Sequence, residues 1–204
     1  MGKRLSKIYT RTGDDGTTGT GTGDRLSKNS QVFVAMGDID ELNSHLGMVM
    51  ALLSQDMPVN TTQNSTSQNN TSQDDITHTL SVIAHLLFNL GGELAMPKFV
   101  GITKTHTQFL EHAIDTMNDT LPSLQDFILP KGTPLVCQIH IARSVARRAE
   151  RSCVRLQEQT GQLSADSLTF INRLSDYLFV LARFVTPTDS VQETLWDKRI
   201  LDNL

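Results

Sequence analysis

Apolar residues recur at every third and fourth position over five stretches of the chain, and this spacing is typical of amphipathic helices. In the first stretch, Ala35, Ile39 and Leu42 begin a row of apolar residues that continues to Leu53. The five predicted helices span residues 31–53, 75–95, 104–121, 134–159 and 165–185. No stretch has the alternation of a convincing strand, so the pattern predicts an all-α fold, a five-helix antiparallel bundle.

The segments between these helices differ in character. Residues 54–75 are crowded with Asn, Gln, Ser and Thr and have almost nothing to bury, which predicts a disordered polar insertion. The loop of residues 122–134 carries Phe127 and Ile128, which are unusually apolar for a loop. These two side chains either close the end of the bundle or project into a binding cleft. We expect Trp196, the single tryptophan, to pack across the bundle from the C-terminal tail.

The composition of the whole chain limits the classes of function that are compatible with it. The 204 residues, 38% of them hydrophobic, suit one domain, residues 1–204. The net charge of −4 gives no general attraction to nucleic acid or to an anionic membrane. No apolar run approaches the ~20 residues of a membrane span, and no secretory signal is recognisable. Cys137 and Cys153 share one predicted helix at a separation of ~24 Å, too far for a disulfide. We therefore expect a cytoplasmic protein.

Residues 10–24 form the first candidate site, with five glycines, six threonines and no aliphatic or aromatic residue. Glycines allow successive backbone amides to turn towards a ligand, and such a nest of amides binds anions. Asp14 and Asp15 would hold a hard cation that accompanies phosphates, and Lys28 would contact a phosphate. The segment lacks the GxxxxGK[ST] motif, and its composition also fits a flexible tail. Residues 1–30 are thus a candidate phosphate-binding segment.

The fourth predicted helix carries the second candidate site. Residues 143–156 contain five arginines, one glutamate and no lysine. Arginine offers a rigid fork of donors that suits phosphate and carboxylate groups, whereas a solvated helix face usually mixes Lys with Glu. The face is therefore either an anion-binding or interface surface, or a plain charged surface. Four arginines follow at intervals of four residues: Arg143, Arg147, Arg151 and Arg155.

Polar residues also lie on two other predicted helices. Asp40 on the first helix is either a surface acid or the partner of one arginine. On the last helix, Asn172, Asp176 and Arg183 share a polar face.

Six segments, taken in order, resemble the ATP:cob(I)alamin adenosyltransferases of the propanediol-utilisation (PduO) type. They are IYTRTGDDGTTGTGTGDRLSK, DIDELNSHLG, LFNLGGELA, FILPKGTP, HIARSVARRAER and INRLSDYLFVLAR. The resemblance implies a ferritin-like helical bundle that assembles into a homotrimer with active sites between subunits. It also implies transfer of the 5′-deoxyadenosyl group of ATP to the cobalt of cob(I)alamin, with release of triphosphate.

The resemblance further implies roles for individual residues. Arg147 and Arg151 would be catalytic and bind ATP, and Phe127 would bind cobalamin and displace the lower axial ligand of the corrinoid. Asp40 and Arg143 would form an ion pair across the subunit boundary. The residues implied to bind ATP are Thr10, Arg11, Thr12, Gly13, Thr17, Thr18, Lys28, Arg147, Arg148, Glu150, Arg151 and Asn172.

The implied cofactors are ATP, Mg²⁺ and cobalamin, with cobalamin as a substrate and Glu150 as the residue that holds Mg²⁺ together with the phosphates. A cob(II)alamin reductase or an adenosylcobalamin-dependent enzyme is a further expected partner, and neither nucleic acid nor membrane is expected. Cob(I)alamin is a strong nucleophile that needs no catalytic base, and none is evident in the sequence. Two alternatives stay open: another ATP-dependent transferase or kinase, and a non-enzymatic helical module that docks an acidic partner or RNA.

Overall fold

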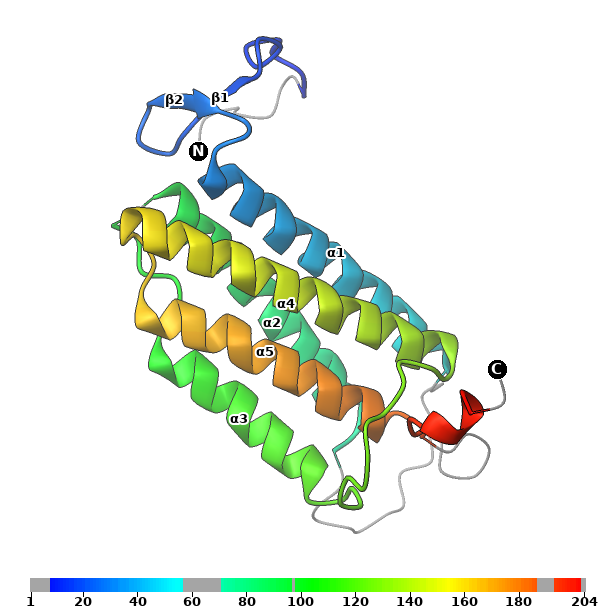
Figure 1. Cartoon of the computed structure of the whole chain (residues 1–204). Coiled ribbons are helices and arrows are strands. Elements are labelled where there is room, and N and C mark those ends of the chain that lie inside the picture. Colours follow the sequence, from blue (N-terminus) through cyan, green and yellow to red (C-terminus); the bar gives the residue numbers. More distant parts are fainter. Residues whose placement is uncertain (1–7, 57–70, 97, 187–192, 203–204) are drawn as a thin grey trace.

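Five long helices make up most of the computed structural model, which describes residues 8–56, 71–96, 98–186 and 193–202 (Figure 1). The predicted all-α class with five helices is confirmed. In the described part of the chain, no helix has an apolar stretch long enough to span a bilayer. The helices are α1 (Gln31–Asp56), α2 (Gln73–Ala95), α3 (Lys104–Asn118), α4 (Pro134–Thr160) and α5 (Ala165–Phe184), and a short 3₁₀ helix, η1 (Lys198–Ile200), follows in the tail.

Helix α4 begins and ends where local chemistry dictates. The Thr133 side chain accepts a hydrogen bond from the amide of Val136 at 3.3 Å, and Pro134 takes the first helical position, where its missing N–H is not needed. Gly161 ends the helix with a φ of 65°, in the left-handed region that glycine adopts without strain. The predicted bounds of this helix, 134–159, are therefore nearly those of the structure.

The polar segment after α1 is shorter than predicted. Helix α1 continues to Asp56, and α2 already begins at Gln73. Ser72 and Asp75 form a capping box, in which the Ser72 hydroxyl accepts from the Asp75 amide at 3.1 Å and the Asp75 carboxylate accepts from the Ser72 amide at 2.9 Å. The predicted insertion over 54–75 is too long at both ends, because residues 54–56 continue α1 and Ser72 and Asp75 cap α2. Residues 57–70 lie outside the described residues, so their predicted disorder stays a prediction.

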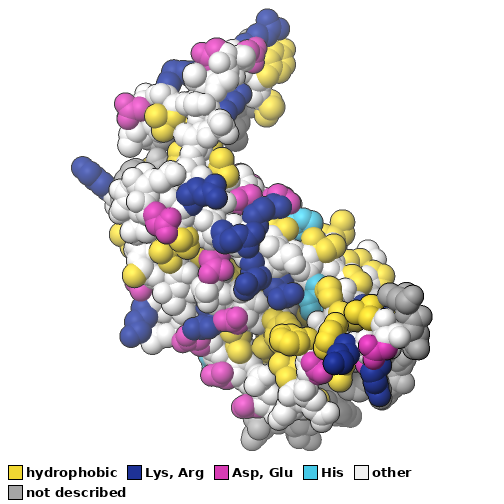
Figure 2. Space-filling view, viewed as in Figure 1, with side chains coloured by type: hydrophobic (Ala, Val, Ile, Leu, Met, Phe, Trp, Pro, Cys, Tyr) yellow, Lys and Arg dark blue, Asp and Glu magenta, His cyan; other side chains and the backbone are white. Residues whose placement is uncertain are grey.

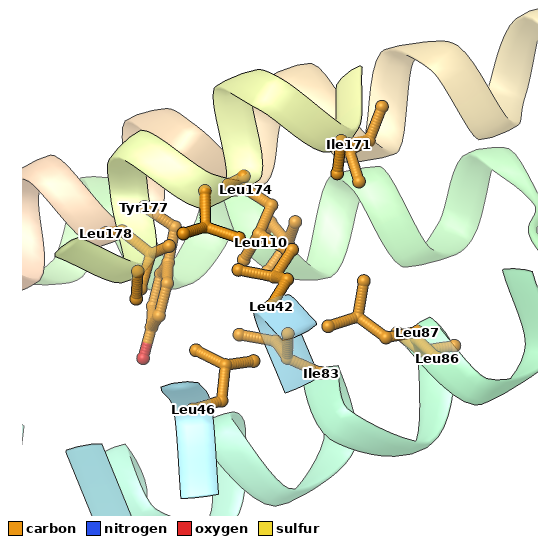
Figure 3. Packing of buried hydrophobic residues seen from close by; sticks show 14 of the residues in the cluster. Leu42, Leu46, Ile83, Leu86, Leu87, Leu110, Ile171, Leu174, Tyr177 and Leu178 are labelled. Carbon is orange, nitrogen blue, oxygen red and sulfur yellow. The ribbon is translucent and has the colours of Figure 1, made fainter. Parts of the chain in front are cut away.

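The helices pack through the apolar stripes that the sequence predicts. Helix α1 packs on α2 and α4, while α5 packs on α4 and α3, and the buried side chains form one continuous cluster. Consecutive helices alternate in direction, so that α3 and α5 run the same way side by side (Figure 1). Figure 3 shows side chains from four helices that meet in this core: Leu42, Ile83, Leu110 and Leu174. The core holds α4 in place and leaves its opposite face exposed.

The Gly/Thr-rich segment contains a small β-hairpin that the sequence does not predict. Strands β1 (Thr17–Gly19) and β2 (Arg25–Ser27) pair in antiparallel register, with Thr17 opposite Ser27. The hairpin stands beyond the end of the bundle at which α1 begins (Figure 1). Gly21 lies against the end of α2, and a Cβ atom there would meet the Ala95 carbonyl oxygen at 2.8 Å, so this approach requires glycine.

The C-terminal tail does not pack across the bundle as expected. Residues 193–196 lie along the loop between α3 and α4, where Leu195 forms an antiparallel bridge with Ile128. Trp196 is 44% exposed. Arg183, predicted on a polar face of α5, is buried, and Glu193 of the tail pairs with it.

Candidate active site

The exposed face of α4 gathers the positive charge of the bundle. The buried stripe of this helix, which includes Ala142, Ala146 and Ala149, turns the neighbouring arginines towards solvent. Figure 2 shows the dark blue Lys and Arg side chains together over this face. Among the described residues, no carboxylate pairs with Arg147 or Arg151. These two arginines, with residues 150, 154, 155 and 158, line an open depression of about 360 Å³.

Glu150 and Asn172 meet beside this depression. The Asn172 side-chain amide donates a hydrogen bond to Oε1 of Glu150 at 2.7 Å, which joins α5 to α4. Within the described residues, the second carboxylate oxygen of Glu150 accepts no hydrogen bond. The structure thus brings together four residues predicted to bind ATP: Arg147, Glu150, Arg151 and Asn172.

Arg143 lies one turn before Arg147 and is half-buried. Its guanidinium carbon lies 5.8 Å from the centroid of the Phe179 ring. Burial, and then the charge of Arg147, lower the pKa of Arg143. Its buried Nε atom has no acceptor among the described residues, and Asp40, its predicted partner, is exposed on α1 and does not pair with it within this chain. A buried cationic donor normally has an acceptor, and the described residues do not supply one for this arginine.

Arg148 points to a different neighbour from the other arginines. Its Nε atom lies 3.0 Å from Oδ1 of Asp38, and its Nη2 atom pairs with Glu41, so it joins α4 to α1. Ser152 donates a further hydrogen bond to Asp38 at 2.5 Å. The predicted contact of Arg148 with ATP stays a prediction. In this structure, the Arg148 side chain pairs with the carboxylates of Asp38 and Glu41.

The N-terminal segment folds into a compact polar pocket of about 290 Å³. Arg11 adopts a φ of 61°, which is uncommon for a residue with a side chain and turns the backbone sharply. The amide of Lys28 donates to the Gly16 carbonyl at 2.9 Å, and a Cβ atom on Gly13 would lie 3.2 Å from the Lys28 ammonium nitrogen. Six of the seven residues predicted to line the triphosphate border this pocket: Thr10, Arg11, Thr12, Gly13, Thr18 and Lys28.

Arg25 organises this pocket and is not among the residues predicted from the sequence. Its Nε atom donates to the Thr17 hydroxyl at 3.0 Å, and Nη2 donates to the Thr12 carbonyl oxygen. Asp15 accepts from the hydroxyl and amide of Thr17 at 2.7 and 2.9 Å, and these bonds lower the pKa of Asp15. Thr17, the seventh predicted residue, therefore braces the pocket. The role of Arg25 depends on the hairpin, which places Arg25 opposite Gly19 and which the sequence does not predict.

Phe127 is 81% exposed, so it does not close the end of the bundle. Its amide donates to the Asp126 carboxylate at 2.7 Å, and its ring makes no contact with the buried core cluster. A groove of about 520 Å³ runs along the exposed face of α4 that follows this loop. Its lining residues are Pro130, Cys137, His140, Ile141, Ser144, Val145, Arg148 and Arg151.

A sequence profile of the cobalamin adenosyltransferase family matches residues 8–185. The chain is 42% identical over 198 residues to a cobalamin adenosyltransferase of Cupriavidus metallidurans. The aligned region covers 97% of this chain and 98% of that protein. The chain belongs to the cobalamin adenosyltransferase family. The predicted family and the predicted class of enzyme are therefore confirmed. A corrinoid adenosyltransferase of Bacillus subtilis is a further relative, 36% identical over 94% of this chain and 93% of that protein.

Solved structures of this family share the fold of the chain. A Phe-to-Ala variant of the PduO-type ATP:corrinoid adenosyltransferase from Lactobacillus reuteri, complexed with cobalamin and ATP, superposes with a TM-score of 0.78. It is 36% identical and covers 93% of this chain and 99% of its own. An Arg-to-Lys variant from the same organism, complexed with ATP, gives a TM-score of 0.77 at 34% identity, over 93% of this chain and 100% of its own.

The two cationic regions of this family member remain separate within one chain. The pocket of the N-terminal segment is lined only by residues 9–28, whereas the depression on α4 is lined only by residues 147–158. The hairpin lies beyond the end of the bundle (Figure 1), and the depression lies over the second half of α4. Each region offers donors for an anion.

Proposed function

We propose that this member of the family transfers the 5′-deoxyadenosyl group of ATP to the cobalt of cob(I)alamin, giving adenosylcobalamin and triphosphate. The observation that carries the proposal is the pair Arg147 and Arg151, two exposed cations without a carboxylate partner among the described residues. Guanidinium groups that have no carboxylate partner, with the carboxylate of Glu150 beside them, are more typical of a nucleotide-binding site than of a solvated surface.

The reaction needs alignment and charge stabilisation rather than acid–base chemistry. The electron pair of Co(I) attacks C5′ of ATP, the Co–C bond forms, and the C5′–O bond breaks. The bonding electrons leave with the triphosphate, so negative charge grows on the leaving group. Arg147 and Arg151 stabilise that charge, while the protein holds cobalt and C5′ in line. Cob(I)alamin is already a strong nucleophile, and no proton needs to be removed.

The N-terminal segment binds the triphosphate in this proposal. Lys28 supplies a point charge, Arg11 a second cation, and Gly13 the room for a phosphate to approach the backbone. Arg25 and Asp15 hold Thr17 and the Thr12 carbonyl in place. Thr10, Thr12 and Thr18 add hydroxyl donors at the same pocket.

Mg²⁺ is proposed to bind between Glu150 and the phosphates of ATP. Magnesium commonly uses one or two carboxylates and completes its shell with phosphate oxygens and water. Glu150 fits this role, because Asn172 occupies one carboxylate oxygen and leaves the other available. The described residues contain no group of three or more His, Cys, Asp or Glu side chains that could hold a metal unaided. Phosphate oxygens and water would therefore supply the remaining ligands.

A homotrimer with sites shared between subunits is the proposed assembly. Arg143 has a buried Nε atom without an acceptor among the described residues, and the exposed Asp40 of a neighbouring copy would supply one. The same arrangement would bring the N-terminal segment of one copy to the α4 arginines of the next. This joins the two regions that stay separate in one chain.

Phe127 is proposed to act on the corrinoid rather than on ATP. An apolar ring under the corrin occupies the place of the lower axial ligand and keeps water out. Cobalt that has lost this ligand is reduced more readily to the nucleophilic state. The 81% exposure of the Phe127 side chain leaves the ring available for such a contact.

A cytoplasmic location and a reductase partner complete the proposal. Both cysteines are free thiols, as expected in a reducing compartment. A cob(II)alamin reductase would supply the reduced substrate, and an adenosylcobalamin-dependent enzyme would receive the product.

The test is a spectral assay of adenosylcobalamin formed from ATP and chemically reduced cobalamin, with triphosphate measured in the same sample. We expect one triphosphate for each adenosylcobalamin. Formation of ADP with another acceptor would indicate a kinase instead. Binding of RNA but not of ATP on a filter would indicate a non-enzymatic module, and either result would overturn the proposal.

A further inference from the structure

The C-terminal tail holds the backbone of Phe127, although residues 193–196 lie beyond the part of the chain that matches the family profile. The amide of Trp196 donates to the Phe127 carbonyl at 2.7 Å, and the amide of Leu129 donates to the Thr194 carbonyl at 2.8 Å. Ile128 and Leu195 face each other between these bonds as an antiparallel bridge. The tail is thus a strand that splints the loop on both sides of its tip.

The position of Phe127 depends on this pairing with the tail, because few other contacts hold the residue in place. With 81% of its side chain exposed, the ring gains no position from core packing. Its other hydrogen bond runs to Asp126, the preceding residue, and so does not tie the loop to the bundle. A short two-stranded pairing is weak by itself, so the strand has to be anchored at another point.

Arg183 provides that anchor at the last turn of α5. Its side chain is only 4% exposed, and its Nε atom donates to Oε1 of Glu193 at 2.6 Å. Its Nη2 atom also donates to the Pro122 carbonyl oxygen at 2.8 Å. One buried guanidinium therefore ties the bundle to the start of the loop and to the tail. A buried cation that loses its carboxylate is strongly unfavourable, so Glu193 is held firmly.

We infer that Arg183 and Glu193 are positioning residues for Phe127, acting through the tail strand of residues 193–196. The inference rests on the role proposed for Phe127 in the displacement of the lower corrinoid ligand. Neither residue lines the pocket of the N-terminal segment or the depression on α4. Their loss should therefore affect the corrinoid step and spare the binding of ATP.

Glu193→Ala tests the inference in the full chain, since Arg183→Ala would also leave a cavity in the bundle. Turnover from cob(II)alamin and a reductant should fall roughly 10–100-fold, as expected when a reacting group is displaced by about 1 Å. The spectroscopic signature of four-coordinate cob(II)alamin should be lost, and KM for ATP should stay unchanged. Amide hydrogen exchange at residues 127–129 should become faster. Arg199→Ala, which breaks an exposed ion pair with Asp197 in the same tail, is the matched control and should behave as wild type.

A double-mutant cycle separates positioning from a merely structural effect. In a Phe127→Ala background, Glu193→Ala should change turnover by less than about twofold, because the residue that it positions is already gone. Additive losses would overturn the inference, and so would faster exchange with an unchanged spectroscopic signature and unchanged turnover. Both results leave the proposed function standing. A wild-type protein that forms no adenosylcobalamin would instead refute the proposed function, and unchanged amide exchange in Glu193→Ala would still refute the splint.

Discussion

Arg147 and Arg151 have no carboxylate partner among the described residues, and this makes them the sharpest test at the scale of single residues. Arg147→Ala and Arg151→Ala should each remove ~2–4 kcal/mol of transition-state stabilisation, because each deletes charge-assisted hydrogen bonds to the leaving triphosphate. The helical circular dichroism should not change. The measurement is kcat/KM for ATP, with Arg199→Ala, an exposed arginine of the tail, as the control. Values near wild type in either variant would show that the face is only a solvated surface.

The two cysteines of α4 should differ in reactivity because they differ in burial. Burial, reinforced by nearby acidic groups, raises the pKa of the Cys153 thiol to about 12. At pH 8 only about one such thiol in 10⁴ is ionised, and the thiolate is the reactive form. Iodoacetamide should therefore modify the half-buried Cys137 and spare Cys153 in the native protein, as read by mass spectrometry of peptides. Denatured protein, in which both react, is the control, and rapid native labelling of Cys153 would contradict its burial.

The arginines also show what a sequence can and cannot reveal about single residues. The stripe that contains Arg147 and Arg151 follows from helical spacing alone, and the structure places both on the exposed face. Arg148 and Arg183 are the same residue type, but Asp38 on another helix and Glu193 in the tail neutralise them. Such partners come from distant parts of the chain, so spacing could not identify which guanidinium groups remain free.

At the scale of elements, hydrophobic periodicity predicted the five helices because each buries a continuous stripe in one core. The errors lie where polar residues have structural roles. Ser72 falls in the predicted polar insertion, and it instead caps α2 together with Asp75. The hairpin of residues 17–27 was missed because its strands have three residues each and bury little, so no alternation of apolar residues marks them.

The cap of α2 yields a stability prediction. Ser72→Ala should lower the free energy of unfolding by about 1 kcal/mol, because the amide of Asp75 loses its acceptor. Urea denaturation followed by circular dichroism is the measurement. Ser54→Ala, at an exposed position near the end of α1, is the control and should change stability by less than about 0.5 kcal/mol. Equal effects of the two substitutions would show that the capping box contributes nothing particular.

Residues 57–70 should be dispensable for folding. Replacement of these residues by a four-residue Gly/Ser linker should change the free energy of unfolding by less than ~1 kcal/mol, since loop length enters stability only logarithmically. The replacement keeps Ser72 and Gln73, because the Gln73 side chain donates to the Leu53 carbonyl at 3.1 Å. Denaturation and light scattering of the shortened chain provide the measurement. Loss of folding or of assembly would mean that the segment packs against the rest of the protein.

At the scale of the whole molecule, the proposed subunit boundary can be tested through its ion pair. Asp40→Arg and Arg143→Asp should each impair activity and assembly, and the double reversal should restore part of both. The coupling in a double-mutant cycle should be ~1–3 kcal/mol. Light scattering gives the oligomeric state in parallel. Additive losses, or a monomeric native protein, would refute a shared interface at Arg143.

Complementation between variants tests whether each site is divided between two copies. Lys28→Ala disables the N-terminal segment, and Arg147→Ala disables the α4 face. When the two variants are expressed together, random assortment in a trimer leaves about a quarter of the sites with both regions intact. Adenosylcobalamin formation should rise towards that fraction of wild-type activity. Mixtures as inactive as their components would place both regions of each site within one chain.

In the proposed homotrimer, the position of the hairpin beyond the end of the bundle would also link the supply of ATP to assembly (Figure 1). A nucleotide held by the segment of one copy and the α4 face of another binds only the associated state, so it stabilises that state by mass action. Dilution should then lower the activity per molecule, and saturating ATP should counteract the loss. In this arrangement, ATP stabilises the contact between subunits in addition to taking part in the reaction. A cell depleted of ATP would therefore hold fewer complete active sites, in addition to fewer occupied ones.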